Sequence, residues 1–234
     1  MNANADQAPN QLAFELPHRQ ALGAEDFLVS RSNEAAVAFV DGWPRWPNPT
    51  VMVAGPQDSG KSHLAHVWQL RSGAPIVQAA SVGDAHVAEF VDQKAMVVED
   101  VDRGASDERV LFHLLNLARE RGLSLLLTSR ALPGEIAIDL PDLRSRLRAM
   151  PVVRIEAPDE ALLKSVLVKL FADRQVTVEP HVIDHIALHM ERSMAAAGQV
   201  VAEADRLSLA LGRRVSRAVA AEALRIVGNR LATG

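Results

Sequence analysis

The chain has 234 residues, of which 48% are hydrophobic, with a net charge of −4 and no cysteine. This length and apolar content predict a full hydrophobic core, in one large domain or in a large and a small one. The lack of cysteine excludes disulfides, thiolate metal sites and cysteine nucleophiles, and the negative charge argues against a nucleic-acid coat. No signal-peptide pattern and no apolar run of about 20 residues is present, so we expect a cytoplasmic protein without membrane contact.

The first patterned segment is 11–16, in which Leu12, Phe14 and Leu16 alternate with other residues before Pro17. Such alternation predicts an extended segment, and a proline cannot continue a strand ladder. The residues alone leave two interpretations open. The segment is either an edge strand on its own domain, which the pattern favours, or a linear peptide that docks into a partner's pocket.

A phosphate-binding loop is predicted at 55–62, where the sequence GPQDSGKS follows the apolar run 51–54 and precedes the helical pattern 63–70. Glycines allow the backbone to approach phosphates, the helix N-terminus directs N–H groups at them, the lysine binds the outer phosphates and the hydroxyl binds Mg²⁺. The residues expected to contact a nucleotide here are Pro56, Asp58, Ser59, Gly60, Lys61, Ser62 and His63.

Apolar runs then alternate with helical patterns. Strands are predicted at 51–54, 75–78, 95–98, 123–127 and 152–155, with helices between them, which indicates an α/β fold with a parallel five-stranded sheet. Beyond residue 157 only helical patterns remain, which predicts a bundle of about four helices. We therefore divide the chain into an N-terminal tail at 1–20, a nucleotide-binding domain at 21–156 and a helical lid at 157–234.

Two acidic residues, Glu99 and Asp100, follow the predicted strand 95–98. Open parallel sheets bind ligands at this end, and phosphoryl transfer requires Mg²⁺ and a positioned water molecule. Glu99 and Asp100 are therefore candidates to hold Mg²⁺ together with Ser62 and to orient the water, and which of the two holds the metal stays open. Ser129 or Thr128, after the next strand, is a candidate γ-phosphate sensor.

Arginines at 144, 146 and 148 cannot all share one helical face, so one of them can point toward a neighbouring molecule. An arginine presented to a partner's γ-phosphate stabilises transition-state charge. The alternative, which the residues alone favour, is a basic turn that is solvated or touches nucleic acid. His181, His185 and His189 lie four residues apart, but no carboxylate is patterned with them, so we predict no metal site there.

Over nearly its whole length the chain resembles the DnaA-related branch of the AAA+ ATPases, specifically the Hda-type regulators of the replication initiator DnaA. The most diagnostic segment is LPDLRSRL at 140–147. The other segments that carry the resemblance are FLVSRSN at 27–33, GPQDSGKS at 55–62, Glu99-Asp100 and LTS at 127–129.

The resemblance implies a fold of an AAA+ domain with a four-helix lid, with ADP or ATP and Mg²⁺ as ligands. It implies that Arg146 is an arginine finger and that Phe27, Leu28 and Val29 line an adenine pocket. It also implies that Gln11, Leu12 and Phe14 belong to a peptide that binds the DNA polymerase III sliding clamp, in place of an edge strand.

The function implied by the resemblance is promotion of ATP hydrolysis on DnaA, which converts the initiator to its inactive ADP form. The chain's own turnover is expected to be weak, and self-association is compatible with sites that neighbouring subunits complete. Because the sequence ends at Gly234 without a helix-turn-helix domain, we expect no direct sequence-specific DNA binding.

The sequence departs from the family pattern at several positions. Glu99 stands where aspartate is expected, and Arg130 stands where an acidic residue is usual. The lid arginine expected to sense phosphates aligns with Ala195, which leaves Arg192, one turn earlier, as the sensor candidate. Two alternative functions stay open: an autonomous ATPase or helicase-loader-like motor, and an adaptor that bridges DnaA to another partner without affecting hydrolysis.

Overall fold

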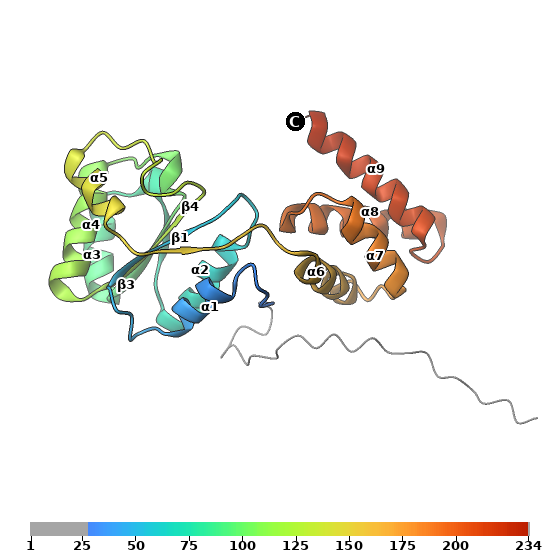
Figure 1. The fold of residues 1–234 in the computed structure, drawn as a ribbon, viewed down its shortest axis with the longest axis horizontal. Helices are drawn as coiled ribbons and strands as arrows, with labels where there is room; N and C mark the ends of the chain where they lie inside the picture. Colours follow the sequence, from blue (N-terminus) through green and yellow to red (C-terminus); the bar gives the residue numbers. More distant parts are fainter. Residues whose placement is uncertain (1–27, 234) are drawn as a thin grey trace, which may run out of the picture.

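The computed structural model describes residues 28–233, which form a parallel sheet with flanking helices and a separate helical bundle (Figure 1). The strand order is β2-β3-β4-β1-β5. The strands are β1 (Thr50–Ala54), β2 (Ile76–Gln78), β3 (Ala95–Glu99), β4 (Ser124–Ser129) and β5 (Val152–Arg154). The predicted five-stranded parallel α/β fold is confirmed, whereas Gln11, Leu12, Phe14 and Phe27 lie outside the described residues.

Helices cover both faces of the sheet, which is why the central strands read as continuous apolar runs. Successive side chains on a strand point to opposite faces. Met96 on β3 packs in one core with the helices α3, α4 and α5, and the next residue, Val97, packs in the other core with α1 and α2. The helices are α1 (Glu34–Asp41), α2 (Lys61–Ser72), α3 (Asp84–Gln93), α4 (Glu108–Arg121) and α5 (Pro141–Arg148).

The chain leaves β5 and enters a bundle of four helices with its own apolar core (Figure 1). Asp159 caps the first of these helices, because its side chain accepts a hydrogen bond from the Leu162 N–H at 2.7 Å. This helical bundle consists of α6 (Glu160–Asp173), α7 (Pro180–His189), α8 (Met194–Leu211) and α9 (Arg217–Thr233).

One buried carboxylate ties the last two helices together. Glu203 on α8 is 5% exposed and accepts hydrogen bonds from Arg206 at 3.0 Å and from Arg230 on α9 at 3.2 Å. The hydrogen bonds from Arg206 hold the pKa of Glu203 below its usual range.

None of the helices within residues 28–233 has the length and apolar character needed to cross a bilayer.

The separate cores predict that the helical bundle can be destabilised without loosening the sheet. Leu167 on α6 is fully buried in the bundle core, so Leu167→Ala should cost about 3 kcal/mol of local stability through lost contacts and a cavity. Its neighbour Val168 is 49% exposed, and Val168→Ala is the matched control. Amide hydrogen exchange should show faster exchange in α6 to α9 for Leu167→Ala only. Equal loss of protection in β1, β3 and β4 would contradict separate units.

Candidate functional site

The loop at 55–60 connects the carboxyl end of β1 to α2, and its backbone conformation is tightly restricted. Asp58 and Gly60 lie in the left-handed region, with φ of 55° and 102°. A Cβ atom on Gly55 would lie 2.3 Å from the carbonyl oxygen of Ile155, just after β5, so this position admits no side chain. The two glycines of the predicted phosphate-binding loop are therefore needed for different reasons. Gly55 has no room for a side chain, and Gly60 has a left-handed backbone conformation.

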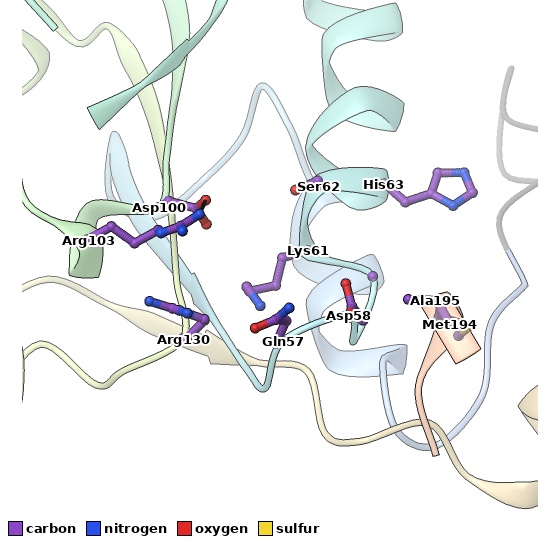
Figure 2. Close-up of a pocket in the computed structure, with 11 residues that line it drawn as sticks. Gln57, Asp58, Lys61, Ser62, His63, Asp100, Arg103, Arg130, Met194 and Ala195 are labelled. Carbon is purple, nitrogen blue, oxygen red and sulfur yellow. Dashed lines mark ion pairs between the residues drawn. The ribbon is translucent and has the colours of Figure 1, made fainter. Parts of the chain in front are cut away.

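A cavity of about 520 Å³ opens in front of this loop (Figure 2). The loop and α2 form one wall, the carboxyl ends of β3 and β4 form another, and the start of α8 closes the remaining side. The residues that line this phosphate-side cavity are Gln57, Asp58, Gly60, Lys61, Ser62, His63, Asp100, Arg103, Arg130, Met194 and Ala195.

Lys61 is the buried cation of the cavity, with 7% exposure. Its Nζ donates hydrogen bonds to the carbonyl oxygens of Gly55 at 2.8 Å and Pro56 at 2.6 Å. Burial lowers the pKa of Lys61, and the carboxylates of Asp100, Asp102 and Asp58 partly offset this. The ammonium group thus lies inside a loop whose carbonyls position it, next to carboxylates that favour its charged form.

Asp100 presents its carboxylate to the same cavity. Its φ of 56° is in the left-handed region, which is unusual for a residue other than glycine and clusters at functional sites. Its backbone N–H donates to Thr128 Oγ1 at 3.0 Å, and its Oδ2 lies 3.5 Å from Arg103 Nη1. Thr128 therefore positions Asp100 from the neighbouring strand.

Glu99 lies elsewhere, although it is adjacent in sequence. It is 6% exposed, does not line the cavity, and accepts a hydrogen bond at 2.9 Å from the Gln78 side chain, its register partner on β2. Its Oε1 has no hydrogen-bond partner among residues 28–233. Asp100 therefore lines the cavity together with Ser62, whereas Glu99 does not line it.

Ser62 and Asp100 are the cavity residues suited to Mg²⁺. Among the described residues, no three histidine or acidic side chains converge as a metal site. Mg²⁺ is usually held by one or two protein oxygens together with phosphates and water, so a hydroxyl and one carboxylate fit this ion.

A second, mostly apolar cavity of about 240 Å³ adjoins the first and lies between the sheet and the helical bundle. Gly60, His63 and Met194 line both cavities. The Met194 N–H donates to the Asp58 carbonyl at 3.2 Å, which joins α8 to the loop. The residues that line this second cavity are Leu28, Asn33, Ser59, Gly60, His63, Leu162, Val166, Lys169, Leu170, Met194 and Gly198.

Several predicted residues lie away from both cavities. Ser129 is buried and exchanges hydrogen bonds with the backbone of Ala131. Val29 packs against the core beside α1 and α2. Arg192 is exposed before α8, and Arg146 lies on α5; neither lines the cavities.

Other cavity residues escaped the sequence patterns. Met194 and the α6 residues belong to no local motif, because their position at the cavities depends on how the helical bundle meets the loop, and Ala195 stood out only as the position aligned with the lid arginine. In the sequence, Arg130 stands out only as a departure from the family pattern directly after 127–129. Arg103 stands out only because it lies near Glu99 and Asp100. Gln78 could have been noted as a polar residue ending a strand.

The chain matches no protein-family model and no curated protein sequence. Solved structures share its fold. Domain III of DnaA from Thermotoga maritima has a TM-score of 0.69 and 17% identity, with coverage of 86% of this chain and 94% of that chain. AMPPCP-bound DnaA from Aquifex aeolicus has a TM-score of 0.63 and 19% identity, covering 78% of this chain but 63% of that one.

The Holliday junction branch migration motor RuvB from Thermotoga maritima is also similar, with a TM-score of 0.65, 14% identity and coverage of 85% of this chain and 70% of that chain. These likenesses show that the chain has the fold of AAA+ domains such as DnaA domain III and RuvB. The chain spans less than two thirds of the Aquifex aeolicus DnaA.

Because Gly55 lies so close to Ile155, we expect a single added methyl group at this position to lower the stability of the protein. Gly55→Ala should cost about 1 to 3 kcal/mol, because the loop or β5 must shift to relieve the clash. Gly83→Ala is the control, since a Cβ there meets no atom within 4 Å. Urea unfolding of both variants measures the difference. Equal midpoints for the two variants would show that the loop is not held against Ile155.

Proposed function

We propose that this chain binds an adenine nucleotide with Mg²⁺ where the sheet meets the helical bundle, and that it regulates replication initiation by promoting hydrolysis of DnaA-bound ATP. The nucleotide site rests on the pairing of a charged cavity at the loop with an adjoining apolar cavity. A nucleotide has the same division, with charged phosphates at one end and an apolar base at the other.

The charged cavity supplies the groups that bind phosphates. Lys61 can exchange its loop carbonyls for phosphate oxygens, and the N–H groups at the start of α2 face the same space. Ser62 and Asp100 would hold Mg²⁺, which neutralises phosphate charge when bound. The DnaA of similar fold bound to AMPPCP supports an adenine nucleotide as the ligand.

The apolar cavity supports a role for the nucleotide in coupling the two parts of the chain. Its walls come from the segment before α1, from the loop and from α6 and α8, so a base held there touches both the sheet part and the helical bundle. With Glu99 held by Gln78 and Arg192 outside the cavity, the bound nucleotide is proposed to set the angle between these parts rather than to power a motor.

Loss of the lysine should therefore strongly weaken nucleotide binding. Lys61→Ala removes a charge-assisted contact to phosphate and should weaken ATP binding roughly 100-fold. Lys94→Ala, at an exposed position after α3, is the control and should bind normally. Titration with ATP under Mg²⁺ measures both affinities. Lys61→Ala should also lose regulation of DnaA, and normal regulation by a nucleotide-free variant would contradict the coupling role.

Arg146 is proposed to act on another molecule's nucleotide. It lies on α5, outside both cavities of its own chain. Within residues 28–233, no side-chain hydrogen bond or ion pair involves its guanidinium group. Its helix neighbour Arg144 is instead occupied, because its Nε donates to the Ile138 carbonyl at 3.0 Å. The resemblance at 140–147 supports Arg146 as the finger, with Gln11, Leu12 and Phe14 proposed to bind the clamp.

Single-turnover hydrolysis of DnaA-bound ATP, with clamp loaded on DNA, tests this role. Arg146→Ala should remove the stimulation, which for an arginine finger can amount to roughly 10³-fold or more. Gln11→Ala should remove the stimulation only in reactions that require the clamp. Arg148→Ala, on the same helix, is the control.

The rival function is an autonomous ATPase, which the position of Asp100 in the cavity favours. Brisk ATP turnover by the chain alone, with DnaA hydrolysis unaffected by Arg146→Ala, would overturn the regulatory proposal in favour of this one. Clamp-dependent binding of DnaA without any effect on its hydrolysis would instead support the bridging adaptor.

A further inference from the structure

The positive charge of the phosphate-side cavity comes from the sheet side alone. Lys61, Arg103 and Arg130 line the cavity, whereas the helical bundle contributes the uncharged Met194 and Ala195. In Figure 2 the two arginines lie on the side opposite Met194 and Ala195. Apart from Lys61, the lysine and arginine side chains that line this cavity therefore come from the ends of β3 and β4.

Arg130 is held in place at both its backbone and its side chain. Its backbone N–H donates to Asp102 Oδ1 at 3.0 Å, and its Nε donates to Asp102 Oδ2 at 2.7 Å. The Asp102 side chain is 7% exposed, so this anchor is itself fixed by packing. Among residues 28–233, neither Nη group of Arg130 has a hydrogen-bond partner. A pre-oriented guanidinium with two free amino groups matches the geometry of phosphate oxygens.

Arg103 is held differently. Its only described ion pair is a longer contact of 3.5 Å to Asp100, and its side chain is 63% exposed. Asp100 is also the carboxylate expected to hold Mg²⁺, so the Arg103 contact competes with the metal. Arg130 is therefore the better positioned of the two arginines.

The two cavities indicate which phosphate Arg130 would meet. Gly60, His63 and Met194 line both cavities and mark the passage between base and phosphates. Arg130, Arg103 and Asp100 line the charged cavity but not the apolar one. With the base in the apolar cavity, the phosphate farthest from it lies toward Arg130.

We propose that Arg130, anchored by Asp102, binds the terminal phosphate of a nucleoside triphosphate bound in the same chain, so that this site distinguishes tri- from diphosphates. The inference rests on the nucleotide site proposed above. Among the described residues that line the phosphate-side cavity, the helical bundle supplies no lysine or arginine, so Arg130 supplies this cation from directly after β4. Because Arg130 is proposed to contact the phosphate that only a triphosphate carries, its removal should weaken triphosphate binding and leave diphosphate binding unchanged.

Isothermal titration of the full chain with AMPPCP and with ADP, each with Mg²⁺, tests this selectivity. Arg130→Ala should weaken AMPPCP binding roughly 10- to 100-fold, the loss expected for charge-assisted hydrogen bonds, and leave ADP affinity within about twofold. Asp102→Asn should show a smaller loss in the same direction, because the guanidinium remains but loses its anchor. Arg148→Ala, which removes an exposed arginine from α5, is the charge-matched control and should change neither affinity.

The outcomes separate this inference from the site on which it rests. If the intact chain binds both nucleotides and Arg130→Ala weakens neither, or weakens both equally, the terminal-phosphate role is overturned while the nucleotide site stands. If the intact chain binds neither nucleotide, the site itself fails and the inference fails with it. A selective loss for AMPPCP cannot arise from general misfolding, because the same variant would still bind ADP.

Discussion

The site depends on how the loop at 55–60 is held between neighbouring strands. The Gly55 N–H donates to the carbonyl of Ser129, the last residue of β4, and the Ile155 N–H after β5 donates to the Ala54 carbonyl, so the loop leaves the sheet along one path. Gly55 passes so close to Ile155 that no side chain fits. This path places the buried Lys61 and the start of α2 at the cavity, and the other functional groups are arranged around them.

The parallel sheet assembles the rest of the charged cavity. Because all strands run in one direction, β3 and β4 end at the same edge as β1, where ligands bind in open α/β sheets. Asp100 and Asp102 follow β3, and Arg130 follows β4. The hydrogen bonds from the Asp100 backbone N–H to Thr128 and from Arg130 to Asp102 cross between these two strand ends and hold this wall of the site together.

The proposed division of labour follows from where each arginine lies. Arg130 faces the cavity of its own chain, whereas Arg146 lies on α5, away from it. The first would report which nucleotide is bound, and the second would act on a nucleotide held by DnaA. The apolar cavity between the sheet part and the helical bundle would let the bound nucleotide connect the two through their relative position, as the Met194 contact to Asp58 already does.

The sequence by itself determined the strands, the helices and the glycine-containing loop at 55–60, because each is encoded by neighbouring residues: apolar runs for β1, β3 and β4, and a cap such as Asp159 for α6. Only the tertiary structure separated Glu99 from Asp100, since this depends on Gln78 from another strand and on the left-handed backbone at Asp100. It also placed Arg130 and the α6 and α8 residues at the cavities. These positions depend on residues that lie far apart in sequence and meet only when the chain folds, and no local pattern encodes that meeting.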